Sequence, residues 1–419
     1  MRSKWQWLLV QLGRTLWVRA VCFSVLAIVA ALLAIGVGPL VPASLANLLG
    51  QGVVDHVLDI MAGSMLAVTT FSLTVMVSAY GSATASVTPR AVRLLMQDTT
   101  SQNVLSTFLG AFLYSLVAIV MLGARAYDAG GRFVLFLVTL TVIVLVVLAL
   151  LRWISHLTTF GRVGDTTRRV EEAAAAAVHH WVCYPCLGAQ CLDENVAVPP
   201  HAVPVFAACT GYVQHLDVGR LAQCAQGLDA DIYVLAPPGS FVHGGRPLAR
   251  VVGAKANDIA AEVAAAFTVG EERSFDQDPR FGLCVLAEIA SRALSPAVND
   301  PGTAIDVLGR SVRILSELAP ASVQSKAQHT RLFVPPLSAQ ALFDDFFTPI
   351  ARDGAGHIEV QVRLQKVLHA LAVLQPVSLQ PAASRHSALA LERALQALPL
   401  AAERDGLASE VAQLFPRTS

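Results

Sequence analysis

Charged residues are scarce in this chain. Only 14% of its 419 residues are Asp, Glu, Lys or Arg, and 54% are hydrophobic, whereas a soluble protein carries about 25% charged residues. Part of the chain is therefore expected to lie outside water. Residues 1–160 hold nine Lys/Arg and four Asp/Glu, and the remainder holds 21 and 26. Because the second part lacks the basic excess that nucleic-acid binding requires, we expect no nucleic-acid partner.

Catalytic motifs are also missing. We find no Walker loop, dinucleotide fingerprint, zinc-protease motif or nucleophile–base set. Gly239, Gly244 and Gly245 lie in expected β turns and do not open a helix, so they do not predict a phosphate loop. The sequence thus predicts neither an enzyme nor a cofactor.

Four long apolar stretches are present instead. They cover residues 16–39, 60–80, 104–123 and 133–154, and none carries a charged residue in its middle. About 20 apolar residues are needed to cross a hydrocarbon core as a helix, which satisfies its own backbone hydrogen bonds. We therefore predict a membrane domain at residues 1–160 with four transmembrane helices, the second of which can continue to Val87.

The flanking positive charges predict the orientation, because Lys and Arg accumulate on the cytoplasmic side. Only Arg125 and Arg132 lie on one side, between the third and fourth spans. The other side has ten: Arg2, Lys4, Arg14, Arg19, Arg90, Arg93, Arg152, Arg162, Arg168 and Arg169. We expect a multi-pass protein of a bacterial inner membrane, in contact with membrane lipid, with both termini in the cytoplasm.

The second span carries hydroxyl side chains at every fourth position. They are Thr70, Thr74, Ser78, Ser82 and Ser86. On a helix this spacing forms one slowly winding stripe. The stripe has two interpretations: close helix packing, in which small residues let backbones approach, or the lining of an oligomeric pore. Because no span holds an ionisable residue at mid-depth, charge-coupled pumps and voltage sensors are disfavoured, and passive permeation is not.

After a connecting helix and a cysteine-containing loop at residues 161–195, short β-prone segments predict a small β domain at 196–253. The segment Pro238–Val251 is similar to the barrel-sandwich hybrid of biotinyl and lipoyl carriers. Carriers attach their cofactor to a lysine, and residues 196–252 contain none, so neither biotin nor lipoate is expected. Residues 331–335 predict an edge strand.

Seven cysteines are present, an odd number with scattered spacing, which does not predict a disulfide framework. Six of them lie in the part expected in the reducing cytoplasm. Cys183, Cys186 and Cys191 stand near His179 and His180, but a structural zinc site has a second ligand pair that is missing here. We therefore predict no metal site and assign these three cysteines no role.

Residues 254–419 predict a helical domain. Asp278 precedes Pro279, and Asn299-Asp300 precedes Pro301, as expected for two helix starts with an acidic N-cap. Capping alone explains these residues. The alternative is that the two helix starts lie close together and bind a small anion with their open N–H groups.

The order of these features resembles a bacterial family of predicted membrane proteins, domain of unknown function family 2254. The resemblance covers about residues 5–375. Its matching segments are residues 62–65 and 71–74, Thr88-Pro89-Arg90, residues 211–213, Gln277-Asp278-Pro279, residues 281–282 and 292–297, Asn299-Asp300-Pro301 and residues 303–304. The resemblance implies a membrane location and this architecture, and it implies no activity and no catalytic residues.

Two functions are consistent with these observations. The first is an oligomeric channel or passive transport protein, in which the second span lines the path and the cytoplasmic domain gates it. The alternative is a membrane-anchored scaffold or sensor, in which the spans only anchor and dimerise and the cytoplasmic domain binds a partner or a small anion.

Overall fold

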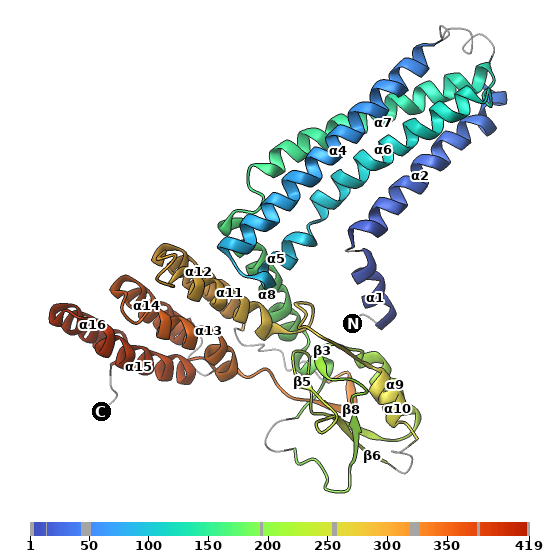
Figure 1. Ribbon diagram of the computed structural model, residues 1–419. Coiled ribbons are helices and arrows are strands. Elements are labelled where there is room, and N and C mark those ends of the chain that lie inside the picture. Colours follow the sequence, from blue (N-terminus) through green and yellow to red (C-terminus); the bar gives the residue numbers. More distant parts are fainter. Residues whose placement is uncertain are drawn as a thin grey trace. The chain divides into compact units, whose positions relative to one another are not determined.

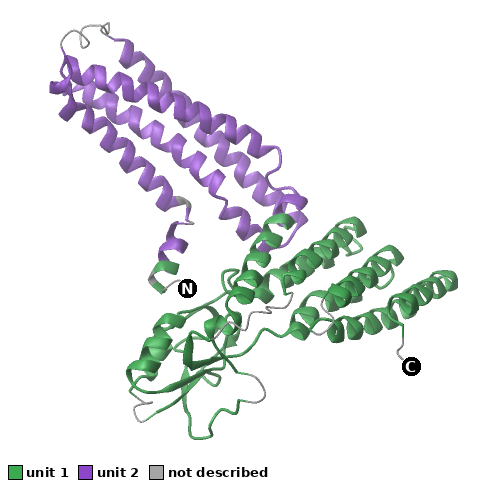
Figure 2. Ribbon diagram, turned by 180° about the vertical axis from the view of Figure 1, so that it is seen from behind, with its two compact units in different colours: residues 1–7, 167–419 green, residues 8–166 purple. Residues whose placement is uncertain are grey.

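The structure is a computed structural model that describes residues 4–13, 15–42, 52–192, 196–253, 258–318, 327–374 and 378–416. The expected domain boundaries at 195 and 254 lie outside these residues. The chain divides into two compact units, which are drawn in different colours in Figure 2. We call residues 8–166 the membrane unit, and residues 1–7 together with 167–419 the α/β unit.

Four helices of the membrane unit are long and apolar enough to cross a bilayer, which confirms the four expected spans. They are α2 (Leu16–Val37, with a short 3-10 extension), α4 (Val53–Ser86), α6 (Thr99–Gly123) and α7 (Ala129–Leu157), labelled in Figure 1. At 34 residues α4 is about 51 Å long, which exceeds the roughly 30 Å of a hydrocarbon core. Its ends therefore extend beyond the apolar layer.

Helix α6 lies at the centre of the bundle and packs against α2, α4 and α7. Gly110 permits the approach to α2, since a Cβ there would lie 3.3 Å from the Phe23 carbonyl oxygen. The fully buried Tyr114 hydroxyl contacts the Thr139 hydroxyl at 2.9 Å and so joins α6 to α7. A short helix, α5 (Pro89–Met96), connects α4 to α6 and begins at the Thr88 cap.

The α/β unit contains two small sheets. The first has five strands in the order β1 (Ala189–Cys191), β8 (His329–Val334), β4 (Asp231–Val234), β6 (Pro247–Val252) and β2 (Val203–Phe206). The second has three strands in the order β5 (Phe241–Val242), β3 (Gly211–Leu216) and β7 (Phe267–Gly270). Their apolar faces share one core with α9 (Val218–Gly227) and α10 (Ala260–Ala265).

The strands extend beyond the expected β segment. β1, β7 and β8 come from outside residues 196–253, and the Pro238–Val251 segment supplies one strand to each sheet. The prediction that residues 331–335 form an edge strand was wrong, because β8 runs parallel to both of its neighbours, β1 and β4. Pro335 suggested an edge, but it stands just after the strand, where its missing N–H costs no ladder hydrogen bond.

The remaining helices of the α/β unit begin with α8 (Val163–Cys183), the connecting helix that the sequence predicted within residues 161–195. The others are α11 (Pro279–Ala293), α12 (Pro301–Ser316), α13 (Ala339–Asp353), α14 (Ile358–Leu374), α15 (Gln380–Ala397) and α16 (Ala401–Leu414). Helices α11 to α16 stack side by side (Figure 1), with α11 against α12 and α13, and α14 against α12, α15 and α16.

Candidate functional site

The hydroxyl stripe of α4 lies on the outer face of the membrane unit. Thr70, Thr74, Ser78, Ser82 and Ser86 are all exposed. The residues that α4 buries against the bundle belong to the opposite side of the helix: Val54, Leu58, Met61, Met65, Ser72, Met76 and Ala83. The stripe therefore packs against no other helix of its own chain in the described residues.

The stripe hydroxyls differ in their hydrogen bonding. Thr70, Thr74 and Ser86 each donate to the backbone carbonyl four residues earlier, at 2.9–3.0 Å. Within the described part of the chain the hydroxyls of Ser78 and Ser82 make no hydrogen bond. An unsatisfied hydroxyl is costly in an apolar medium. These two hydroxyls would therefore gain stability from a hydrogen-bond partner outside the chain.

A groove of about 690 Å³ runs along the C-terminal half of the stripe. Four stripe residues line one side, and the turn after α7, with Phe160, Gly161 and Arg162, lines the other. Gly161 has a left-handed φ of +77° and lies close enough to α4 that a Cβ would sit 3.2 Å from Ala79. Arg162 is the one charged side chain among the described residues that line the groove.

A buried polar cluster that the sequence analysis missed joins α6 to α7. Asp98 caps α6 by accepting from the Ser101 backbone N–H at 2.7 Å, and its carboxylate is 2.9 Å from His156 Nε2. Ser101 Oγ lies 3.2 Å from the same nitrogen. In a catalytic triad the acid and the hydroxyl contact different ring nitrogens, so this arrangement is a cap and helix crosslink. The cap was visible in Asp98 followed by Ser101, but its contact with His156 was not.

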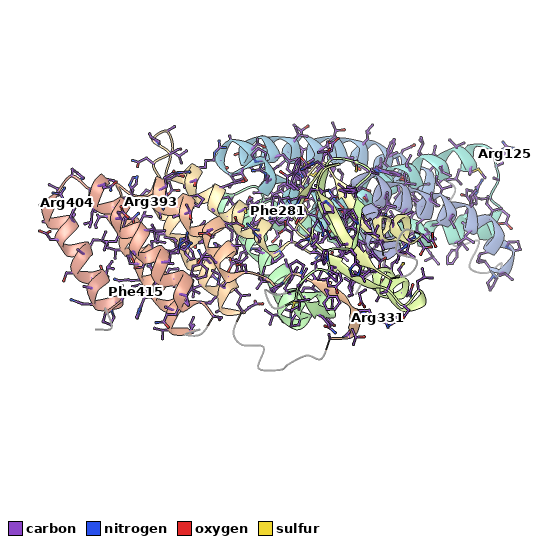
Figure 3. The ribbon with its side chains drawn as sticks, turned by 90° about the horizontal axis from the view of Figure 1, so that it is seen from below. Arg125, Phe281, Arg331, Arg393, Arg404 and Phe415 are labelled. Atoms are coloured by element: carbon purple, nitrogen blue, oxygen red, sulfur yellow. A yellow bond between two sulfur atoms is a disulfide. The ribbon has the colours of Figure 1, made fainter. Side chains whose placement is uncertain are left out.

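Asp278 is a buried structural residue. It caps α11 by accepting from the Arg280 and Phe281 backbone N–H groups, and Arg273 holds it with two bonds of 2.7 and 3.0 Å. Burial by itself lowers the pKa of Arg273, but the bonds to Asp278 raise it overall. Phe281, labelled in Figure 3, lies with its ring centroid 5.1 Å from the guanidinium carbon of Arg273. These contacts leave the carboxylate no free face for a ligand.

Gln277 and Gly282, which stand near Asp278 in the sequence, also join the start of α11 to its neighbours. Gln277 accepts from the Leu216 N–H at 2.8 Å and so ties the start of α11 to β3. Its carbonyl accepts from the Trp181 indole of α8 at 3.0 Å. At Gly282 a Cβ would come within 2.8 Å of the Ala174 Cα, so only glycine lets α11 and α8 approach this closely.

Asn299 and Asp300 lie at the opposite end of α11. Asp300 caps α12 through the Thr303 N–H at 3.0 Å, and its bonds to Thr303 lower its pKa. Asn299 is exposed with a left-handed φ of 49°. Because the 15 residues of α11 separate the two caps by about 22 Å, Asp278 and Asp300 do not form one anion site.

The cysteine loop differs from the sequence prediction. Cys186 and Cys191 form a disulfide, whereas Cys183 is free and exposed, with its Sγ 3.4 Å from His179 Nε2. The odd count and scattered spacing argue against a disulfide framework and do not address one local bridge between residues five apart, whereas the expected reducing compartment did not predict it. No three His, Cys, Asp or Glu side chains gather into a metal-binding group in the described ranges.

The N-terminal residues Lys4–Trp7 insert into the α/β unit, to which they belong. Trp7 is 6% exposed, stacks on the buried His215 ring at 5.3 Å, and donates its indole N–H to Asp276 at 2.9 Å. The Lys4 backbone N–H donates to Asp217 at 2.6 Å. We call this the Trp7 socket. Nothing in the sequence around Trp7 predicts this contact.

The four spans and the exposed stripe define a multi-pass membrane protein. The family model described as predicted membrane protein, domain of unknown function 2254, matches residues 13–370. The chain belongs to this family, as its motif order indicated.

Relatives in two mycobacteria are similar to this chain. Uncharacterised proteins of Mycobacterium tuberculosis (strain H37Rv) and Mycobacterium bovis are each 30% identical over 273 residues. The match covers 62% of this chain and 51% of each relative, so the chain spans about half the length of the relatives it matches. No solved structure matches the chain.

Proposed function

We propose that the protein assembles into an oligomer of a bacterial inner membrane whose α4 helices face one another and line a passive path for small solutes. One observation carries the proposal: all five stripe residues are exposed on the side of α4 away from the residues it buries in the bundle. A polar stripe on the perimeter of a membrane unit has three possible neighbours, which are lipid, water and another copy of the chain.

Lipid is the least favourable of the three at the C-terminal half of the stripe. The large exposed apolar residues of α4 end at Val77. Beyond it the exposed positions are small or hydroxylated, and the free hydroxyls of Ser78 and Ser82 find no acceptor in acyl chains. Small residues at four-residue spacing let helices of neighbouring chains approach, and hydroxyls can bond across such an interface.

The orientation proposed from the flanking arginines places both termini and the α/β unit in the cytoplasm. The α/β unit continues into the membrane unit through α8, and the Trp7 socket holds the helix Lys4–Gly13, which precedes the first span. A domain held to two spans can pass a conformational change to both of them. We propose that this coupling gates the path.

A matched pair of threonines tests the path. Thr74 of α4 and Thr141 of α7 are both exposed, and both donate to the carbonyl four residues earlier, at 3.0 and 2.9 Å. Only Thr74 lies on the stripe. In proteoliposomes loaded with a panel of ions and small solutes, Thr74→Leu should lower the flux by about tenfold, equivalent to about 1.4 kcal/mol of added barrier. Thr141→Leu should leave it unchanged.

The scaffold alternative predicts a different pattern from the same preparation. If the spans only anchor the α/β unit, the wild-type chain passes nothing on the panel. Equal losses for Thr74→Leu and Thr141→Leu would show that general damage to the bundle, rather than the stripe, controls the flux. Either result removes the proposed path along α4.

A further inference from the structure

The Cys186–Cys191 disulfide is asymmetric in its exposure. The two Cα atoms are 5.3 Å apart; Cys186 lies in the loop that connects α8 to β1, and Cys191 is the last residue of β1. Cys186 is 2% exposed and belongs to the core of the α/β unit, whereas Cys191 is exposed. A thiol from solution can therefore reach the sulfur of Cys191, while the sulfur of Cys186 is shielded.

The backbone at Cys186 adopts an uncommon conformation. Cys186, Leu187 and Gly188 all have left-handed φ values, of 50°, 57° and 77°. Two of them are not glycine, and such residues rarely adopt this region without constraint from their surroundings. Here the constraints are the disulfide, the full burial of Leu187, and the hydrogen bond from the Gln328 N–H to the Gly188 carbonyl at 2.9 Å.

The disulfide also fixes the outer strand of the five-stranded sheet. Cys191 ends β1 opposite Val334 of β8, and the next residue, Leu192, donates its N–H to the Val334 carbonyl at 2.9 Å. β8 in turn leads to α13 through a short connection. Opening the bridge would release one constraint on the turn Pro185–Gly188 and on β1, directly beside the strand that connects the sheets to the helices.

We propose that Cys186–Cys191 is a reversible thiol–disulfide site that exchanges with cytoplasmic thiols. The proposal rests on the proposed cytoplasmic orientation, because disulfides of reducing compartments are mostly transient and catalytic or redox-sensing. It makes the α/β unit responsive to the redox state of the cell.

The exchange follows ordinary thiol chemistry with a dithiol reductant of the thioredoxin class. Its thiolate attacks Cys191 Sγ, a new S–S bond forms, and the Cys186–Cys191 bond breaks. The electron pair goes to Cys186 Sγ, which takes a proton because its buried site disfavours the thiolate. The second thiol of the reductant then displaces Cys191. The reductant ends as a disulfide, and Cys186 and Cys191 end as thiols.

Cys209 provides an internal control, since it is a free, exposed cysteine of the same unit. We would express the full chain in bacterial cells, quench with acid, alkylate free thiols, reduce, alkylate with a heavy reagent, and measure each cysteine by mass spectrometry. Samples would be taken during growth, after a pulse of the thiol oxidant diamide, and after recovery. Cys186 and Cys191 should be mostly reduced in growth. Their oxidised-to-reduced ratio should rise by on the order of tenfold or more with the pulse, since tenfold corresponds to about 30 mV for a two-electron couple.

The ratio should return after recovery, and Cys209 should stay reduced throughout. Cys191→Ser should abolish the heavy label at Cys186, whereas Cys183→Ser should not change it. Two results would overturn the proposal: a pair that is already oxidised in growth and unchanged by recovery, or a pair that stays reduced after diamide. Labelling of Cys209 in intact cells by a membrane-impermeant maleimide tests the orientation separately. If the pair is permanently oxidised and Cys209 is not labelled, the redox proposal is wrong and the cytoplasmic orientation stands. If Cys209 is labelled, the orientation is wrong as well.

Discussion

Gly239 should be intolerant of even one added methyl group. It precedes β5, has a left-handed φ of +90°, and faces the buried carboxylate of Asp278. A Cβ there would overlap three atoms of that carboxyl group, the farthest at 2.8 Å. Asp278 cannot move aside freely, because Arg273 holds it with two bonds and two backbone N–H groups of α11 donate to it.

The magnitude has two parts. An alanine in the left-handed region costs about 1 kcal/mol. Displacing Asp278 weakens an N-cap worth about 1 kcal/mol and a buried ion pair whose outright loss costs about 3–5 kcal/mol. We therefore expect Gly239→Ala to destabilise the α/β unit by about 3 kcal/mol, which lowers the apparent Tm by roughly 6–12 °C for a unit of this size.

Gly244 is the matched control, because it is exposed, lies in the next turn, and has no heavy atom within 4 Å of an added Cβ. Thermal unfolding of the purified full chain in detergent, followed by tryptophan fluorescence, would compare Gly239→Ala, Gly244→Ala and wild type. If the Gly239→Ala protein has the same Tm as the Gly244→Ala protein, Asp278 is not held immobile by Arg273 and the start of α11.

Two further results are expected. Trp7→Ala removes a side chain whose burial contributes about 3–5 kcal/mol, so the N-terminal segment should leave the socket and trypsin should cleave after Lys4 faster. Trp17→Ala, which changes a 65% exposed tryptophan, should not alter that rate. Burial raises the pKa of Glu171, but bonds from Arg313 and Arg310 lower it overall. Its stabilising contribution is therefore complete above the unfolded value of 4.5 and is lost as the pH falls through the lower folded value. The Tm difference between wild type and Glu171→Gln should shrink as the pH falls below 4.5, and a constant difference would contradict the ion-pair assignment.

The spans could be predicted from the sequence because each one must by itself be long and apolar enough to cross the hydrocarbon core. The ends of α4 were harder to predict. The expected span began at residue 60, but a helix that has left the apolar layer tolerates charged residues such as Asp55 and Asp59, and α4 begins at Val53. Helix caps were also readable, since Asp278 with Pro279 is a local pattern.

Contacts between distant residues could not be predicted in this way. β1 pairs with β8 about 140 positions away, and nothing in the three residues of β1 indicates that partner. His156 reaches Asp98 only because α6 and α7 are antiparallel neighbours. The stripe could be recognised from its spacing. Its exposure could not, because it depends on which face of α4 packs into the bundle. In the structure that face carries Met65, Ser72 and Met76.

The Trp7 socket fastens the N-terminal segment to the α/β unit, so this unit is connected to the membrane unit through two separate segments of the chain. Residues 7–8 and 166–167 are the two places where the chain passes between units. Loss of the Trp7 indole would remove its stacking on His215 and its bond to Asp276, and would weaken the connection at residues 7–8.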